Sequence, residues 1–155
     1  MEDNGSARLL LVDDNTDLLN MLTLALKTLG SFAILRATDG VSGLEQAILE
    51  RPDCIVIDIM MPGLDGYQLV RALRGDPETA EIPLIILTAV AQDTGQFAGL
   101  AAGADQYLTK PTAPQSLIAA IQHAMQLSRM ERARRLRVLT EGTEGIGGVG
   151  GGEGQ

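Results

Sequence analysis

The sequence predicts an α/β fold built on a parallel β-sheet with helices on both faces. Five short apolar segments alternate with five segments of helical character, and this alternation is typical of βαβ units with right-handed crossovers. The apolar segments show no polar–apolar alternation, which indicates strands covered on both faces. With 155 residues, the chain has room for one domain of ordinary size and a sizeable core.

The expected elements follow one another in a regular order. The expected strands are residues 7–12, 32–37, 54–57, 82–87 and 106–108. The expected helices are residues 16–29, 41–50, 64–74, 95–103 and 112–125. In the first helix, Leu18 and Leu22 share one face, and Gly30 is placed to end it. The second helix follows the turn at Asp39 and ends before Pro52, because the residue before a proline disfavours helical geometry.

Turn residues and glycines characterise the remaining helices. A loop over residues 61–63 leads to the third helix, which Asp65 is expected to cap. The fourth helix, residues 95–103, has three glycines in nine residues, so we expect it to be among the more mobile elements. The fifth helix begins at Thr112 or Pro114 and carries apolar residues at helical spacing.

The composition changes twice towards the C-terminus. Residues 128–139 contain five arginines among apolar residues; we expect a solvated helical extension, with a partner-binding or coiled-coil seam as the alternative. Half of residues 140–155 are glycine, which predicts a flexible tail. The expected organisation is therefore a lead over residues 1–6, a folded domain over residues 7–127, the arginine-rich extension and the tail.

Charge and hydropathy exclude some classes of function. A net charge of -8 and a pI near 4.5 argue against direct nucleic-acid binding, which needs a basic face. The sequence has neither a signal peptide nor an apolar stretch of about 18 residues, so we expect no membrane association. The single cysteine, Cys54, lies within an apolar strand and is compatible with a reducing cytoplasm.

Polar side chains gather at the carboxyl ends of the predicted strands. Asp13 and Asp14 follow the first strand, Asp58 follows the third, Thr88 ends the fourth, and Lys110 lies just past the fifth. In an open parallel sheet these ends share the edge at which ligands bind. Three neighbouring carboxylates repel one another unless a cation neutralises them. The oxygen ligands suit Mg²⁺, with Mn²⁺ as a possible substitute.

These groups together suit phosphoryl transfer to Asp58. A lysine amine and a threonine hydroxyl, such as those of Lys110 and Thr88, can both contact phosphoryl oxygens. The central carboxylate is then the nucleophile that forms an aspartyl phosphate. The sequence has no glycine-rich nucleotide-binding motif, so the phosphoryl donor is expected to be another molecule. Taken alone, Asp58 could equally be a structural carboxylate at a strand end.

Four motifs resemble the receiver domain of two-component response regulators. They are, in chain order, Leu10–Asn15, Ile57–Gly66, Ile85–Ala89 and Ala102–Pro111. The resemblance covers about residues 7–127, the whole expected folded part. It implies a flavodoxin-like, doubly wound, five-stranded parallel sheet with strand order 2-1-3-4-5 and five helices.

The resemblance also implies how the acidic residues act. Asp58 would accept a phosphoryl group from a histidine kinase or a phosphotransfer protein. Asp13, Asp14 and Asp58 would hold Mg²⁺ together with the backbone carbonyl of Met60. The protein would be a phosphoprotein of a two-component phosphorelay, and it would catalyse only its own phosphorylation and dephosphorylation.

The remaining site residues take their expected roles from the same resemblance. Thr88 and Lys110 would contact the phosphoryl oxygens. Tyr107 would be an aromatic switch that turns inward when Thr88 moves; half-burial on an edge strand is the simpler alternative for this ring. The peptide bond between Lys110 and Pro111 is expected to be cis.

The expected output is a phosphorylation-dependent change of surface in a single-domain, cytoplasmic regulator. The fourth helix, the fifth strand and the fifth helix would bind an unidentified downstream protein or form a homodimer. Met60 and Val90 flank the phosphorylation site, and neither side chain can orient an attacking water by hydrogen bonding. Self-dephosphorylation is therefore expected to be slow, with a lifetime nearer hours than seconds.

Two other functions remain open at this level. The first is a small phosphatase or phosphotransferase that uses Asp58 on free substrates. Haloacid-dehalogenase-like enzymes carry a second Asp two residues after the nucleophile, where this chain has Met60. The second is a phosphorylation-independent interaction module whose acidic site is vestigial.

Overall fold

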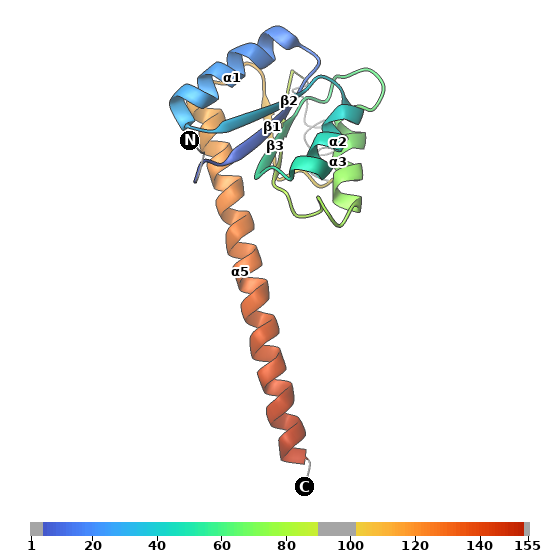
Figure 1. Cartoon of the computed structure of the whole chain (residues 1–155), viewed down its shortest axis with the longest axis vertical. Helices are drawn as coiled ribbons and strands as arrows, with labels where there is room; N and C mark the ends of the chain where they lie inside the picture. Colours follow the sequence, from blue (N-terminus) through green and yellow to red (C-terminus); the bar gives the residue numbers. More distant parts are fainter. Residues whose placement is uncertain (1–4, 90–101, 154–155) are drawn as a thin grey trace. The chain divides into compact units, whose positions relative to one another are not determined.

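A computed structural model describes residues 5–89 and 102–153, with side chains up to residue 141. The chain forms a five-stranded parallel sheet in the order β2-β1-β3-β4-β5 (Figure 1). The strands are β1 (Arg8–Val12), β2 (Ala33–Ala37), β3 (Cys54–Ile57), β4 (Leu84–Thr88) and β5 (Gln106–Thr109). The helices among the described residues are α1 (Thr16–Gly30), α2 (Gly40–Glu50), α3 (Gly66–Gly75) and α5 (Pro114–Glu153). The expected fold class and strand order are confirmed.

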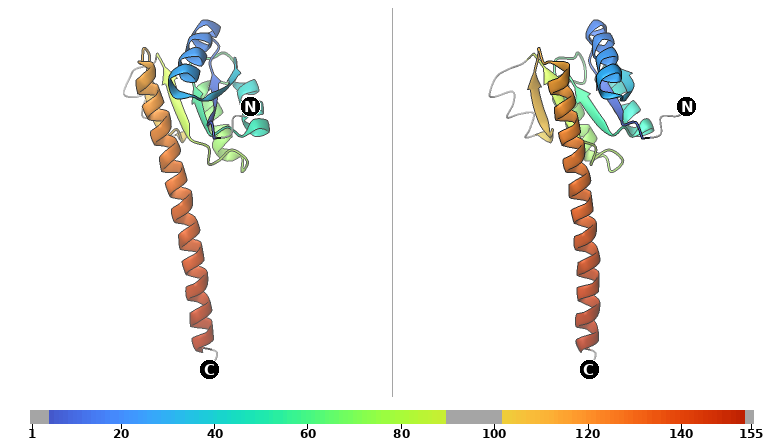
Figure 2. Two further views of the ribbon diagram at one scale, coloured as in Figure 1. Left: turned by 60° about the vertical axis from the view of Figure 1, so that its left-hand side comes forward. Right: turned by 90° about the vertical axis from the view of Figure 1, so that its left-hand side faces the viewer.

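Alternate residues of each strand face opposite sides of the sheet, and each side has its own core. One core joins the strands to α1 and the first turns of α5, and the other joins them to α2 and α3 (Figure 2). Leu9 and Leu11 face the first core, whereas Leu10 and Val12 face the second. Complete burial of one such leucine contributes about 1.5–3 kcal/mol to stability. The two-sided burial explains why the strand sequences are continuously apolar.

Short polar side chains begin three of the helices. Asn15 caps α1, Asp39 caps α2, and Asp65 forms a capping box with Gln68 at the start of α3. Each oxygen accepts a backbone N–H that the first helical turn would leave without a partner. The expected cap at Asp65 is therefore confirmed, and it shifts the start of the third helix from residue 64 to Gly66.

Gly30 is the last residue of α1, but it does not form the turn that ends the helix, although the sequence predicted that it would. The left-handed residue after the helix is Ser31, with φ 58°. A Cβ added to Gly30 would lie 2.5 Å from a ring carbon of Phe32. Gly30 therefore allows the close approach of the Phe32 ring, and the turn itself uses Ser31.

Three strands begin later than expected. β1 begins at Arg8, β2 begins at Ala33, and β4 begins at Leu84 after Pro83. Proline has no N–H to donate to a sheet. Pro83 therefore precedes the strand and contributes only its carbonyl, which accepts the Ile55 N–H at 3.0 Å. The expected fourth helix falls mostly on residues 90–101, which lie outside the described residues.

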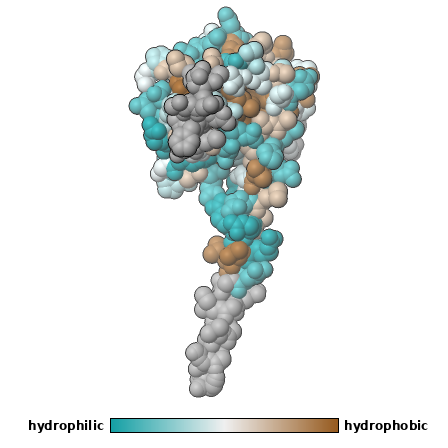
Figure 3. Space-filling view, turned by 180° about the vertical axis from the view of Figure 1, so that it is seen from behind, coloured by the Kyte–Doolittle hydropathy of each residue, from teal (hydrophilic) through white to brown (hydrophobic). Residues whose placement is uncertain are grey.

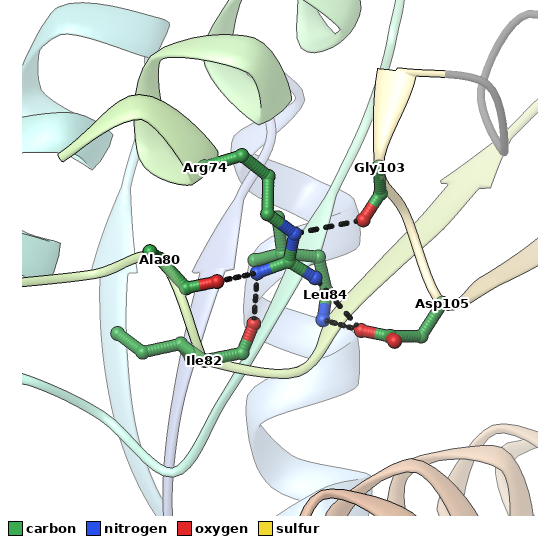
Figure 4. Close-up of polar contacts among 6 residues, drawn as sticks. All are labelled: Arg74, Ala80, Ile82, Leu84, Gly103 and Asp105. Atoms are coloured by element: carbon green, nitrogen blue, oxygen red, sulfur yellow. Dashed lines mark hydrogen bonds and ion pairs between the residues drawn. The ribbon is translucent and has the colours of Figure 1, made fainter. Parts of the chain in front are cut away.

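Arg74 of α3 joins the amino ends of β4 and β5. Its guanidinium donates to the carbonyl oxygens of Gly103, Ala80 and Ile82 at 2.9, 3.0 and 2.6 Å, and to Asp105 Oδ2 at 3.0 Å (Figure 4). The same Asp105 oxygen accepts the N–H of Leu84, the first residue of β4, at 2.8 Å. One planar cation thus links three chain segments at the sheet edge where the strands begin.

From residue 126 onward, the described residues are the later part of α5 and form a unit separate from the preceding domain. Exposed apolar and arginine residues are interspersed along this unit up to residue 141, as the mixed colours of its surface show (Figure 3).

Residues 140–153 are helical, as the end of α5, whereas their glycine content predicts a flexible tail. Each glycine in a helix costs about 1 kcal/mol of helix stability relative to alanine, which favours flexibility here. The flexibility of this stretch stays a prediction. No described helix is both long and apolar enough to cross a membrane.

Candidate functional site

Strand register brings Asp13 and Asp58 together. Val12 of β1 pairs with Ile57 of β3, and each is the last residue of its strand. The Asp58 N–H donates to the Val12 carbonyl at 2.9 Å, and the Asp13 N–H donates to the Ala37 carbonyl at 3.1 Å. The backbone ladder therefore continues one residue past the strands. It fixes the backbone of both acids at the carboxyl edge of the sheet.

Three carboxylates converge at this edge. One oxygen each of Asp13, Asp14 and Asp58 lies within 4.8 Å of the other two. Asp13 and Asp58 are buried, whereas Asp14 is exposed. The backbone N–H of Asn15 donates to Asp13 Oδ1 at 2.9 Å and helps to orient that carboxylate. An oxygen-only donor set that is open to solvent on one side fits a hard divalent cation.

Lys110 follows the edge strand β5 and brings a positive charge to the acidic cluster. Its Nζ lies 2.9 Å from Asp13 Oδ2 and 3.6 Å from Asp58 Oδ2. The Lys110 N–H donates to the Thr88 carbonyl at 2.8 Å, so β5 and β4 stay paired up to this residue. The Lys110–Pro111 peptide bond is cis, as expected. The amine therefore reaches the predicted phosphorylation site.

Thr88 is the last residue of β4 and is completely buried. Its side chain hydrogen-bonds to the carboxylate of Asp58. Thr109 is its partner on β5, one residue before Lys110. The hydroxyl and the amine thus approach Asp58 from neighbouring strands, as their positions in the sequence predict.

The pKa of Asp58 is raised above its ordinary value. Burial of the carboxylate is the main cause, and the nearby charge of Asp13 acts in the same direction. The hydrogen bond from Thr88, the charge of Lys110 and the hydrogen bond from the Met60 N–H act against the rise. These neighbouring groups therefore determine the fraction of Asp58 carboxyl groups that are ionised, which is the nucleophilic form.

The loop after Asp58 is shaped by close backbone contacts. The Met60 N–H donates to Asp58 Oδ1 at 3.3 Å, while the Met60 side chain is exposed. Gly63 has φ 76°, a conformation that glycine adopts readily. A Cβ on Gly66 would lie 2.6 Å from the Asp58 carbonyl oxygen, so α3 begins in direct contact with the Asp58 backbone.

Tyr107 has a partner that the sequence reasoning missed. Its hydroxyl is hydrogen-bonded to Tyr67 of α3, and burial together with this bond raises the pKa of Tyr107 to about 12. Tyr67 lies 40 positions earlier in the chain. No short-range pattern links the two residues. The two rings come together because both pack against the same core cluster.

The structure brings together six of the predicted site residues and leaves others untested. Val90, which was expected to flank the site, lies outside the described residues. Metal coordination by the Met60 carbonyl and the switch role of Tyr107 stay predictions. The residues gathered at the edge are Asp13, Asp14, Asp58, Thr88, Lys110 and the Met60 backbone.

The chain matches known proteins over most of its length. Residues 9–122 match the family model of the response regulator receiver domain. The chain is 42% identical over 115 residues to the protein PilH of Pseudomonas aeruginosa, a match that covers 74% of this chain and 94% of PilH. It is 38% identical over 126 residues to the response regulator MprA of Mycobacterium tuberculosis, covering 81% of this chain and 54% of MprA. The chain thus spans about half the length of several curated relatives.

Solved structures with the same fold include a metal-bound relative. The receiver domain of the sensor histidine kinase PA1611 from Pseudomonas aeruginosa PAO1 matches with a TM-score of 0.73 and 30% identity. The match covers 79% of this chain and 99% of that domain. In the PA1611 domain, a magnesium ion is coordinated in the active site cleft.

Proposed function

The chain belongs to the response regulator receiver family, and from that premise we propose that Asp58 accepts a phosphoryl group and that the protein thereby signals to a partner. The observation that carries the proposal is the convergence on one carboxylate. The Lys110 amine lies 3.6 Å from Asp58, the Thr88 side chain is hydrogen-bonded to it, and two further acids adjoin it. Each of these groups has a separate task in holding a phosphoryl group.

Asp58 acts as the nucleophile. An oxygen of its ionised carboxylate bonds to phosphorus while the bond to the donor's leaving atom breaks, and that atom keeps the electron pair. Lys110 attracts the negatively charged phosphoryl oxygens, and the Thr88 hydroxyl donates to one of them. Such alignment and charge neutralisation are the main demands of phosphoryl transfer.

Asp13, Asp14 and Asp58 would hold the divalent cation, with the Met60 carbonyl as a fourth oxygen ligand. We propose Mg²⁺ as the ion, because the donors are all oxygens and the site is open on the side of the exposed Asp14. Bound there, the ion would neutralise charge on the phosphoryl oxygens. Mn²⁺ prefers the same ligand type and would substitute.

The proposed donor is a phosphohistidine of a histidine kinase or a phosphotransfer protein, encountered in the cytoplasm. Family membership supports this donor class. The proposed output is a changed surface on β5 and the start of α5, which binds a downstream protein or a second copy. The net charge of -8 disfavours direct binding to nucleic acid.

The alternative function, an enzyme that hydrolyses free phosphomonoesters, has less support than the signalling function. Such an enzyme needs a general acid for the leaving group, and the residue two positions after Asp58 is the exposed Met60. We therefore propose that the chain catalyses only its own phosphorylation and dephosphorylation.

Labelling with acetyl phosphate tests the proposed function directly. Wild-type protein with Mg²⁺ is expected to gain one phosphoryl group, seen by intact mass spectrometry, and Asp58→Asn is expected to gain none. Omission of Mg²⁺ is expected to slow the labelling strongly. Absence of labelling in folded wild-type protein would contradict the proposal, and turnover of p-nitrophenyl phosphate lost in Asp58→Asn would favour the enzyme instead.

A further inference from the structure

The two tyrosines of the chain meet between α3 and β5. Tyr67 is the second residue of α3, and Tyr107 is the second residue of β5. Both rings are partly buried and pack against the same core cluster, on the face of the sheet that α2 and α3 cover. Their hydroxyl groups are hydrogen-bonded to each other. This bond connects a helix to a strand that has one neighbour in the sheet.

Burial and the bond with Tyr67 together raise the pKa of Tyr107 to about 12. The Tyr107 hydroxyl therefore stays protonated at neutral pH, and the bond joins two neutral phenols.

Backbone contacts fix the first turn of α3, which carries Tyr67, beside Asp58. The capping box of Asp65 and Gln68 encloses the first turn of α3, in which Tyr67 lies. The preceding residue, Gly66, donates its N–H to the Ile59 carbonyl at 3.2 Å. There is no room for a Cβ on Gly66, which would lie 2.6 Å from the Asp58 carbonyl oxygen and the Ile59 Cα. A shift of the Asp58–Ile59 backbone must therefore also move Tyr67.

The backbone fixes Tyr107 less completely than Tyr67. Among the described strands, β5 pairs with β4 alone, where Tyr107 lies opposite Ile86. This pairing sets the position of its Cα and leaves the ring with alternative rotamers. A tyrosine tolerates both buried and exposed orientations because its hydroxyl is polar. The bond to Tyr67 selects one of them.

We propose that Tyr67 is a positioning residue for Tyr107: it holds the Tyr107 ring in one orientation and ties that orientation to the backbone of Asp58 through the first turn of α3. The proposal rests on the proposed function, in which Asp58 is phosphorylated and the surface around Tyr107 is changed. It adds a connection from Asp58 to Tyr107 that does not pass through Thr88.

Tyrosine-selective labelling isolates this pair, because the chain has two tyrosines and no tryptophan. In protein with ¹³C-labelled tyrosine rings, Tyr107→Phe and Tyr67→Phe each remove one set of ring signals and so assign the other. Tyr67→Phe is expected to move the Tyr107 signals towards their positions in an unfolded peptide, because the ring gains rotamers. Unmoved Tyr107 signals would overturn the proposal.

A double-mutant cycle measures the bond independently. Tyr67→Phe and Tyr107→Phe are each expected to raise the unfolding equilibrium constant, and the two effects are expected to couple by about twofold to tenfold. The control cycle combines Tyr107→Phe with Thr23→Val on α1, whose buried hydroxyl has no hydrogen-bond partner. That control pair is expected to be additive. Additivity of the two tyrosine changes would also overturn the proposal.

The link to phosphorylation is tested with acetyl phosphate and Mg²⁺. Tyr67→Phe is expected to be labelled at Asp58 at the wild-type rate, because Tyr67 is not among the groups that shift the pKa of Asp58. The shift of the Tyr107 signals on labelling is expected to be smaller than in wild type. An equal shift in both proteins would overturn the coupling. Failure of wild-type labelling would contradict the proposed function and leave the signal and cycle measurements to decide the Tyr67–Tyr107 bond.

Discussion

One ammonium group serves two carboxylates from strands that are far apart in the sequence. Lys110 Nζ lies 2.9 Å from Asp13 Oδ2 and 3.6 Å from Asp58 Oδ2. The nearer contact joins residues that are 97 positions apart. Lys110 thus offsets the charge of the acidic cluster and lies beside Asp58, the proposed phosphoacceptor.

Replacement of Lys110 by Met should therefore impair phosphorylation. Labelling by acetyl phosphate should slow by about 10- to 100-fold, because the developing phosphoryl charge loses a nearby cation. The pKa of Asp58, followed by ¹³C NMR of its carboxyl carbon, should rise further, since the charge of Lys110 lowers it. Lys27→Met is the matched control, because Lys27 is the other lysine and lies exposed on α1; it should leave both measurements unchanged.

Asp58→Asn should stabilise the metal-free protein near neutral pH. The pKa of Asp58 is raised in the folded state, so its carboxylate opposes folding once the pH exceeds the ordinary Asp pKa. This loss of wild-type stability grows as the pH rises through the raised pKa and is then constant. Urea denaturation in EDTA should show Asp58→Asn to be more stable by about 0.5–2 kcal/mol at pH 7. The advantage should shrink towards pH 3, and an equal advantage at all pH values would refute this account.

Magnesium should stabilise the fold through the exposed acid of the cluster. The wild-type melting temperature should rise with Mg²⁺ concentration, since a ligand that binds only the folded state stabilises it. Asp14→Asn should weaken Mg²⁺ binding by about tenfold or more in isothermal titration. Glu45→Gln removes an exposed acid from α2 and should bind Mg²⁺ as wild type does. Equal affinities in all three proteins would remove Asp14 from the site.

Arg74→Met should destabilise the protein without affecting phosphorylation chemistry. The change removes the guanidinium donor from three carbonyl oxygens and from Asp105, which keeps the Leu84 N–H, at the amino edge of the sheet. The free energy of unfolding should fall by about 2–3 kcal/mol. Arg71→Met, an exposed change on the same helix, should cost at most about 0.5 kcal/mol. Below the melting temperature, Arg74→Met should still be labelled at Asp58.

The aspartyl phosphate should be long-lived in purified protein. The Met60 side chain is exposed beside the site, and a thioether has no proton to donate to a phosphoryl oxygen or an attacking water. The lifetime, followed by loss of ³²P label, should be nearer hours than seconds. Met60→Gln should shorten it, whereas Met21→Gln on exposed α1 should not. A wild-type half-life of seconds would show that another group orients the water.

Much of the site could be predicted from the sequence. The apolar runs show where strands end, and parallel strands bring their carboxyl ends to one edge. Asp13, Asp58 and Thr88 could therefore be assigned to one cluster before any coordinates were known. Strand boundaries were less accurate, as Pro83 shows, because an apolar run does not distinguish ladder residues from buried residues that precede them.

The sequence by itself determined the fold class, the order of elements and the polar residues at the strand ends, since these depend on local periodicity and turn chemistry. The tertiary structure alone decided which side chains bond across elements. It gave Tyr107 a partner in Tyr67, placed the Phe32 ring against Gly30, and collected four acceptors around Arg74. Such contacts join residues distant in the chain, and they depend on how whole helices pack on the sheet, which no short stretch of sequence specifies.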